Sequence, residues 1–260
     1  MNPADTPAAR PAGAAKFVEG RVVALKPWTE RLYSIQVDAA VEPFRAGQFG
    51  RLALPGEGEM IVRPYSFVNA PFERPLEFYF ITLANGPLTQ RLVKLVPGDP
   101  IWIAPRASGF MTLADIRDAD SLWLLSTGTA IGPFLSICKT EEPWRRFQKV
   151  VLVHAVRYAR ELTYQDTVRA IAERRGSQFA YVPFVSREDT DFALKGRVPQ
   201  AIEDGRLETR VGVPLTAESC QVMICGNPEM VSDTSQVLEA RGLKKNRRKD
   251  PGQITVENYW

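Results

Sequence analysis

Residues 122–133, Leu-Trp-Leu-Leu-Ser-Thr-Gly-Thr-Ala-Ile-Gly-Pro, hold the pattern that decides the fold of the second half of this chain. Four apolar residues in succession are typical of a parallel strand that is covered on both faces. Gly128 would permit a tight exit from that strand, Gly132 a close approach of the backbone, and Pro133 suits the first position of a helix. The helix predicted over residues 134–138 would offer free N–H groups to a pyrophosphate, although the pattern equally fits a plain strand–turn–helix.

Strand-like and helical stretches alternate through the rest of this half. Further apolar, strand-like runs lie at residues 150–153, 179–185, 221–225 and 254–257. Helical stretches lie between them, at residues 161–174, 198–203 and 229–241. Strands that alternate with helices predict a doubly wound α/β domain with a parallel sheet. We expect this domain to span residues 116–260.

The first half shows a different pattern, short β segments separated by Gly and Pro turns. These segments lie at residues 17–23, 33–37, 47–54, 65–68, 76–82 and 101–104. Six short strands of this kind predict a small antiparallel β-barrel, which we place at residues 16–115. One helix interrupts them at residues 88–96, where the apolar residues share one face.

The composition excludes several classes of protein. At 260 residues the chain has room for two domains of ordinary size. A net charge of +3 creates no global field for nucleic acid. No run approaches the roughly 18 apolar residues of a membrane span. Residues 1–15, rich in Ala and Pro, are predicted to be a disordered leader and not a signal peptide.

Cysteine and histidine usage argues against a metal site. Cys138, Cys220 and Cys225 show no paired spacing and are too few for an iron–sulfur cluster. Their scatter fits a reducing compartment, so we expect a cytoplasmic protein. His154 is the single histidine, so zinc and haem are not expected. It ends an apolar run, where a packed or capped side chain is the simplest interpretation.

The stretch Arg63-Pro64-Tyr65-Ser66 offers chemical groups that suit a flavin. Arg63 supplies a permanent forked cation for a phosphate or an electron-rich ring edge, and Pro64 fixes φ. Tyr65 supplies a flat face for stacking and a hydroxyl, and Ser66 a small hydroxyl near the reactive N5 edge. Taken alone, the four residues also fit an ordinary strand edge.

A second candidate phosphate site precedes the helix predicted in the barrel half. Gly86 would let the backbone approach a ligand. Thr89 could present its hydroxyl next to the free N–H groups of a helix start, which bind diphosphate well. The alternative is a crossover helix with a capped start.

Three arginines occupy equivalent places in the predicted sheet. Arg157 and Arg187 follow strand-like runs, and Arg197 precedes a helix. Ligands of open α/β sheets gather at the carboxyl ends of strands, so the three side chains suit the 2′-phosphate of NADP. Each one alone could be a solvated surface residue. Residues 225–228 end another strand there, where the Cys225 sulfur could pack against a nicotinamide or be a buried apolar group.

Four segments, residues 63–66, 86–92, 127–133 and 225–228, occur in the order and spacing of the ferredoxin–NADP reductase family. Over residues 16–260 the chain resembles the compact bacterial branch, the ferredoxin/flavodoxin–NADP(+) reductases. The resemblance implies noncovalent FAD in the barrel and NADP(H) in the α/β domain. The residues that it assigns to FAD are Arg63, Pro64, Tyr65, Ser66, Gly86, Pro87, Leu88, Thr89 and Thr129, and it places Thr129 beside both nucleotides. Those that it assigns to NADP are Gly128, Gly132, Arg157, Arg187, Arg197, Cys225, Gly226 and Asn227.

The resemblance also concerns the last residues, Val256, Glu257, Asn258, Tyr259 and Trp260. Plastid relatives end in an aromatic residue stacked on the flavin, whereas this chain continues past the corresponding position, near Val256. We expect these five residues to return to the FAD, with Trp260 on the adenine as in the bacterial branch. Stacking of a base on an aromatic ring contributes roughly 1–3 kcal/mol. The tail would then act as a lid.

The function expected from these features is that of an oxidoreductase. NADPH would pass a hydride to FAD, which would pass single electrons to ferredoxin or flavodoxin. The catalytic candidates are Ser66, for a hydrogen bond near N5, and Cys225, for packing on the nicotinamide. These carriers are generally acidic, so the basic run at residues 244–249 is a candidate docking site or else a solvated loop. The alternatives are a reductase component of an oxygenase and a flavin-bearing module that binds nucleic acid.

Overall fold

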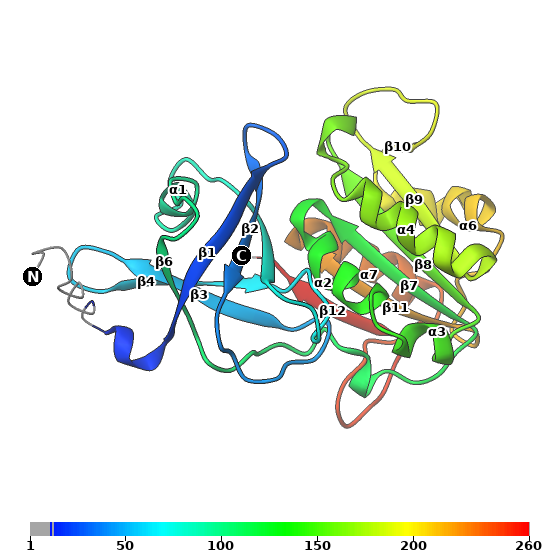
Figure 1. Cartoon of the computed structure of the whole chain (residues 1–260). Helices are drawn as coiled ribbons and strands as arrows, with labels where there is room; N and C mark the ends of the chain where they lie inside the picture. The colour runs from blue at the N-terminus through cyan, green and yellow to red at the C-terminus, as the bar shows by residue number, and fades with distance from the viewer. Residues whose placement is uncertain (1–10, 12, 260) are drawn as a thin grey trace, which may run out of the picture.

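The computed structural model describes residues 11 and 13–259 and arranges them around two six-stranded sheets (Figure 1). The sheet of the N-terminal half is antiparallel, with strand order β4-β3-β6-β1-β2-β5. Its strands are β1 (Val18–Pro27), β2 (Leu32–Asp38), β3 (Phe49–Pro55), β4 (Met60–Ser66), β5 (Leu76–Ile81) and β6 (Pro100–Ile103). The antiparallel barrel predicted from the sequence is confirmed.

The barrel closes just beyond the end of β4. Phe67 forms a bridge to Phe78 of β5, and the Val68 N–H donates to the Glu77 carbonyl at 2.9 Å. The strand predicted at residues 65–68 begins earlier, at residue 60, and ends at residue 66. Residues 63–66 therefore occupy the second half of β4, immediately before the closure.

The helix of the barrel half, α1 (Thr89–Leu92), is shorter than the one predicted over residues 88–96. After Leu92 the chain tightens, and the Leu95 N–H donates to the Leu92 carbonyl, three residues back, at 3.2 Å. Pro97 accounts only for the exclusion of Val96 from the helix, because a proline disfavours helical geometry in the residue before it. The Val96 N–H donates instead to Asp99 Oδ2 at 2.8 Å.

The second sheet is parallel, with strand order β10-β9-β8-β7-β11-β12. Its strands are β7 (Ser121–Thr127), β8 (Lys149–Val156), β9 (Phe179–Val185), β10 (Leu194–Lys195), β11 (Cys220–Gly226) and β12 (Ile254–Asn258). Its helices are α2 (Ile131–Cys138), α3 (Glu142–Arg146), α4 (Gln165–Arg175), α5 (Val198–Glu203), α6 (Arg206–Val211) and α7 (Pro228–Ala240). This arrangement confirms the predicted doubly wound α/β fold.

The central strand β7 shows why its sequence is apolar without interruption. Leu122 and Leu124 pack into a buried cluster with Phe134 of α2. Trp123 and Leu125 belong to a second cluster, which contains residues of α5, α6 and α7. Side chains alternate along a strand and helices cover both faces of the sheet, so every residue of β7 before Thr127 is buried.

The strand order creates a ligand-binding edge at the end of β7. The chain passes from β7 through β8 and β9 to β10 in one direction, and it returns to β11 and β12 on the other side of β7. Open α/β sheets bind ligands where the strand order reverses, outside the carboxyl ends of the strands. Thr127 ends β7 and Gly226 ends β11, so both lie at this edge.

A chain of buried hydrogen bonds joins the two halves. Trp28 Nε1 donates to Ser34 Oγ at 2.6 Å, and Ser34 Oγ lies 2.6 Å from Tyr164 Oη. Tyr164 Oη donates its one proton to Glu77 Oε1 at 2.7 Å, so Ser34 must be the donor to Tyr164. The barrel residues in the apolar cluster of α2 are Leu32, Val68 and Tyr79. The two sheets therefore share one buried interface.

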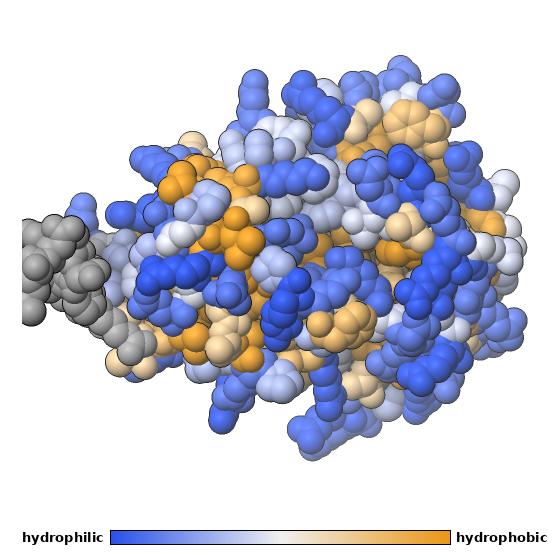
Figure 2. Space-filling view, in the orientation of Figure 1, coloured by the Kyte–Doolittle hydropathy of each residue, from blue (hydrophilic) through white to orange (hydrophobic). Residues whose placement is uncertain are grey.

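Figure 2 shows that hydrophilic side chains cover much of both halves on one face, with apolar areas between them on each half. Within the described residues, no helix combines the length and the apolar character needed to cross a membrane. Of the predicted leader, residues 1–10 and 12 lie outside the described residues. Ala14 is fully buried in the barrel cluster, where η1 (Ala14–Lys16) begins.

Candidate functional site

The first part of the site lies where the end of the chain meets the barrel. Tyr259 follows β12, and its N–H donates to the Gly226 carbonyl at 3.0 Å. Its side chain reaches β4, where Tyr259 Oη donates to Ser66 Oγ at 2.6 Å and also hydrogen-bonds with the Cys225 thiol. The structure thus brings Ser66 and Cys225, the two predicted catalytic candidates, to one point with Tyr259 between them.

Glu257 is held beside this group by the pairing of β11 with β12, in which it lies opposite Cys225. Burial raises the pKa of its carboxyl from 4.5 to about 7, so this group can take up a proton near neutral pH. Burial also raises the pKa of the Cys225 thiol, and the charge of Glu257 adds to this effect. A thiol that stays protonated is a poor nucleophile and suits packing.

The sequence predicts a cofactor contact for Glu257 but not its raised pKa. The sequence signal that could have indicated this raised pKa is an acidic residue in the last strand, next to Val256. In the structure this residue lies in register with a buried cysteine. Of the other predicted tail residues, Val256 and Asn258 are exposed. Trp260 lies outside the described residues.

Arg63, Pro64 and Tyr65 lie next to Ser66 on β4. Arg63 and Pro64 are exposed, and among the described residues Arg63 forms no ion pair with a carboxylate. Tyr65 is half-buried and packs edge-on against Phe80, with 6.0 Å between ring centroids. Burial raises the pKa of its hydroxyl to about 12, so the group stays a hydrogen-bond donor. The Arg63 guanidinium donates to the Val62 carbonyl at 2.7 Å and keeps its other N–H groups available. A guanidinium, an aromatic ring and a buried hydroxyl in succession fit a flavin nucleotide.

The polar groups of the turn before α1 form hydrogen bonds with one another. The Thr89 hydroxyl donates to the Gly86 carbonyl at 3.2 Å and accepts from the Leu83 N–H at 3.3 Å. A Cβ on Gly86 would lie 2.5 Å from Thr89 Oγ1, so only glycine fits this turn. Leu88 is buried in the barrel core. The Thr89 hydroxyl therefore shapes the turn, and the predicted contacts of residues 86–89 with a pyrophosphate stay a prediction.

The glycine turn after β7 leads directly into a helix, as predicted. Gly128 has φ 54°, in the left-handed region, and η3 (Gly128–Ala130) continues into α2. Gly132 lies against the barrel half, because a Cβ there would lie 3.3 Å from Val68 Cγ2, and its predicted approach to a ligand stays a prediction. Its small size lets α2 approach the barrel. Pro133 is the third residue of α2 and not the first.

Gly226 joins the ends of β7 and β11. Its φ is 143°, and a Cβ at this position would lie 2.0 Å from Thr127 Oγ1. The Asn227 N–H donates to Thr127 Oγ1 at 2.9 Å, so a threonine hydroxyl fastens the two strand ends together. The Asn227 side chain caps α7 by accepting from the Glu229 and Met230 N–H groups. No role of its own was predicted for Thr127 from the sequence. Its position between a strand and a glycine is the only sequence feature that indicates such a role.

Arg157, Arg187 and Arg197 meet at the edge that the sheet topology predicts. Arg157 follows β8, Arg187 follows β9 with its N–H donating to the Arg157 carbonyl at 2.9 Å, and Arg197 is the N-cap of α5. All three are exposed, and none forms an ion pair within the described part of the chain. Glu161 and Glu188 bond backbone N–H groups of the Arg157 loop and leave the guanidinium groups free. This edge therefore carries three exposed cations without a carboxylate partner in the described residues.

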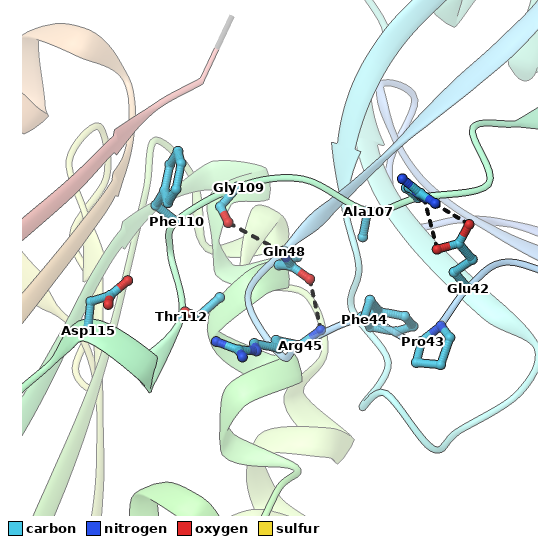
Figure 3. Close-up of a pocket in the computed structure, with 11 residues that line it drawn as sticks. Glu42, Pro43, Phe44, Arg45, Gln48, Ala107, Gly109, Phe110, Thr112 and Asp115 are labelled. Atoms are coloured by element: carbon cyan, nitrogen blue, oxygen red, sulfur yellow. Dashed lines mark hydrogen bonds and ion pairs between the residues drawn. The ribbon is translucent and has the colours of Figure 1, made fainter. Parts of the chain in front are cut away.

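A hollow of about 380 Å³ has Arg45, Gln48, Gly109 and Phe110 among its lining residues (Figure 3). Gln48 lies across it, donating to the Gly109 carbonyl at 3.4 Å and accepting from the Arg45 N–H at 2.9 Å. Phe110 lines it with 85% of its surface exposed. A Cβ on Gly109 would lie 3.5 Å from Glu257 Oε2, which places the hollow next to the site. No predicted site residue lines it.

Comparison with known proteins points to one enzyme family. Residues 124–236 match the family model of the oxidoreductase NAD-binding domain. The flavodoxin/ferredoxin–NADP reductase of Escherichia coli (strain K12) is 44% identical over 247 residues, which cover 95% of this chain and 100% of that protein. The chain belongs to the flavodoxin/ferredoxin–NADP reductase family.

Other relatives of this reductase support the same family assignment. The ferredoxin–NADP reductase of Pseudomonas aeruginosa is 35% identical over 249 residues, which cover 91% of this chain and 95% of that protein. A crystal structure of a ferredoxin NADP+ reductase from Neisseria gonorrhoeae with bound FAD and NADP has a TM-score of 0.89 at 35% identity, covering 95% of this chain and 100% of that one. The family resemblance of the four sequence segments is confirmed, and with it the class of oxidoreductase.

Proposed function

We propose that this reductase transfers electrons between NADPH and ferredoxin or flavodoxin, with FAD as its cofactor. The strongest support is the meeting of Ser66 from the barrel with Cys225 and Tyr259 from the second sheet. A flavin held by the barrel and a nicotinamide held by the sheet would have to touch at such a point. The relative from Neisseria gonorrhoeae binds FAD and NADP, and the relative from Escherichia coli is named for NADP and for both carriers.

Bound FAD supplies the redox chemistry, since a flavin accepts an electron pair as a hydride and releases electrons singly. The chain supplies binding and orientation. Tyr65 would offer its ring face, Arg63 a cation and Ser66 a hydroxyl that it shares with Tyr259. Glu257 would hold a proton beside them. The other residues proposed to contact FAD are Pro64, Gly86, Pro87, Leu88, Thr89, Thr129, Val256, Asn258 and Trp260.

The second sheet would bind NADP(H) at its carboxyl edge. Arg157, Arg187 and Arg197 would bind the 2′-phosphate, because all three are exposed cations without a carboxylate partner in the described chain. Cys225 would pack against the nicotinamide with its thiol protonated. The residues proposed to shape the rest of this site are Gly128, Gly132, Gly226 and Asn227. Residues 16–115 would then form the FAD-binding domain and residues 116–260 the NADP-binding domain.

The carrier that we propose is acidic, and the basic segment at residues 244–249 would contribute to its docking. Most side chains of this segment are exposed. In the part of the chain that is described, Lys245 alone among its cations forms an ion pair, with Glu239 at 3.4 Å. Clustered cations accelerate association with an acidic partner. A cytoplasmic location would keep the buried, unpaired cysteines reduced and stays a prediction.

The experiment that tests this function measures electron transfer to each carrier separately. The purified protein should be yellow with FAD and should reduce ferredoxin or flavodoxin faster with NADPH than with NADH. Reversing charge with Lys244→Glu and Arg248→Glu should slow reduction of the carriers but not of a small neutral quinone. A colourless protein that takes up no FAD would contradict the proposal. Reduction of an oxygenase cluster protein in preference to both carriers would favour the alternative.

A further inference from the structure

His154, the single histidine of the chain, lies under the turn that ends β7. It belongs to β8, where the parallel register places it opposite Ser126. Its side chain is fully buried, and Nε2 lies 3.0 Å from the Gly128 carbonyl oxygen. A carbonyl oxygen can only accept a hydrogen bond, so Nε2 must bear the proton. His154 therefore donates to the backbone of the glycine turn.

The ring makes this bond as a neutral donor. Burial lowers the pKa of His154 to about 4, and the hydrogen bond to Gly128 offsets this effect only in part. With the proton on Nε2, Nδ1 is an acceptor, and among the described residues it has no hydrogen-bond partner. A buried acceptor without a protein partner is unfavourable, so an apolar side chain would pack better here. The hydrogen bond to the Gly128 carbonyl is the contact of His154 that an apolar side chain could not make.

Gly128 needs such a restraint because its backbone is intrinsically free. Its φ of 54° lies in the left-handed region, and a Cβ at this position would meet nothing within 4 Å. Neighbouring side chains thus leave room for the peptide to rotate, and glycine resists such rotation least of all residues. Two donors hold its oxygen, the Ile131 N–H within the first helical turn and His154 Nε2.

The direction of this carbonyl fixes the direction of the next N–H. The Gly128 C=O and the Thr129 N–H belong to one planar trans peptide, so the two bonds point in opposite directions. While the oxygen is held against the buried ring, the Thr129 N–H points away from the interior. The first N–H groups of a helix have no acceptor within it and are available to phosphate.

We propose that His154 is a positioning residue for the nucleotide pyrophosphate, fixing the Gly128–Thr129 peptide so that the Thr129 N–H faces the phosphate. The inference rests on the proposed binding of NADP(H) at this edge. Ser126 supports the arrangement, because its Oγ donates to the Val153 carbonyl at 2.6 Å and locks β7 to β8 next to His154. His154 touches no ligand and acts through the peptide.

Two amide variants give a matched test. In His154→Gln the side-chain N–H can take the place of Nε2, whereas in His154→Asn it reaches only the place of Nδ1. Both variants keep a polar side chain in the same buried position. Calorimetric titration of the FAD-loaded protein then compares two ligands, NADP+ and 2′-AMP. The second ligand has the 2′-phosphate but no pyrophosphate.

We expect His154→Asn to weaken NADP+ binding about tenfold and 2′-AMP binding less than about twofold, since one oriented hydrogen bond to a charged group is lost. His154→Gln should bind both ligands within about threefold of the wild type. In spectra of 15N-labelled protein, NADP+ should shift the Thr129 amide signal in the wild type and in His154→Gln, and less in His154→Asn. If His154 only supported folding, His154→Asn would not weaken the binding of NADP+ more than the binding of 2′-AMP.

Equal losses for both ligands in His154→Asn, or an unchanged NADP+ affinity, would overturn the inference. If His154→Asn does not fold, His154→Gln decides, because a folded Gln variant that loses both NADP+ affinity and the Thr129 shift contradicts it. Wild-type protein that binds neither ligand would refute the proposed function itself. The two failures are therefore distinguishable.

Discussion

Replacing Glu257 by Gln should change how the stability of the reductase depends on pH. Burial raises the pKa of this carboxyl from 4.5 to about 7. Between these values the folded protein binds a proton that the unfolded chain does not. The stabilising contribution of that proton is therefore complete below pH 4.5 and is lost as the pH rises through about 7. Gln keeps the shape of the side chain and cannot titrate.

The magnitude follows from the size of the shift. One pKa unit corresponds to about 1.4 kcal/mol. For a pKa raised from 4.5 to about 7, the free energy of unfolding should fall by roughly 2.5 kcal/mol between pH 5 and pH 8. Part of the carboxyl reaches solvent, so this value is an upper bound. A flavin stacked nearby would bury the group further and would not lower its pKa.

Urea unfolding of the FAD-loaded proteins at pH 5 and pH 8 measures this effect. Between the two conditions the wild type should lose up to about 2.5 kcal/mol more than Glu257→Gln. The control is Glu173→Gln, at an exposed position on α4, which should follow the wild type. Parallel pH profiles for the wild type and Glu257→Gln would refute the reasoning, because the carboxyl would then titrate alike in the folded and unfolded states.

Four further changes test other parts of the site. Arg187→Ala and Arg197→Ala should each lower the preference for NADPH over NADH in kcat/KM by about 10- to 100-fold, since a hydrogen bond to a charged group contributes roughly 1.5–3 kcal/mol. Equal losses with both nucleotides would contradict this. Removing Trp260 should raise the Kd for FAD about 5- to 150-fold by flavin fluorescence, and no change would mean that the tail is not a lid. Gly226→Ala should lower the Tm and the NADP+ affinity more than Gly58→Ala does. Both glycines have positive φ, but of the two only Gly226 has a neighbour within 4 Å of the added Cβ. Equal effects would mean that backbone strain, and not the contact with Thr127, causes the loss.

Both sheets are predictable from the sequence because each follows its own pattern. β7 is apolar at consecutive positions since helices cover both of its faces, and alternation with helical stretches follows from the parallel connections. The shortest elements escape such patterns. β10 has two residues, Leu194 and Lys195, which cannot display a period. α6 has six residues between Gly205 and Gly212, which the sequence does not distinguish from a loop.

The site is predictable only where topology dictates it. Arg157, Arg187 and Arg197 share an edge because the carboxyl ends of parallel strands do. The placement of Ser66 and Cys225 on either side of Tyr259 depends instead on how the barrel packs against the sheet, and no local pattern encodes that packing. Gly132 shows a contact that no local pattern indicates. A glycine in a nucleotide-binding turn predicts close approach to a ligand, and the structure adds close approach to the barrel.

The interface between the halves explains how two separate patterns can produce one site. Arg157 and Tyr164 belong to the same segment, between β8 and α4. Tyr164 adopts φ 59°, a conformation that costs a non-glycine residue roughly 1–2 kcal/mol. Such strain persists only where the surroundings hold it, and here Ser34 and Glu77 of the barrel do so. The segment that bears Arg157, a proposed 2′-phosphate ligand, is therefore anchored to the proposed flavin domain through Tyr164.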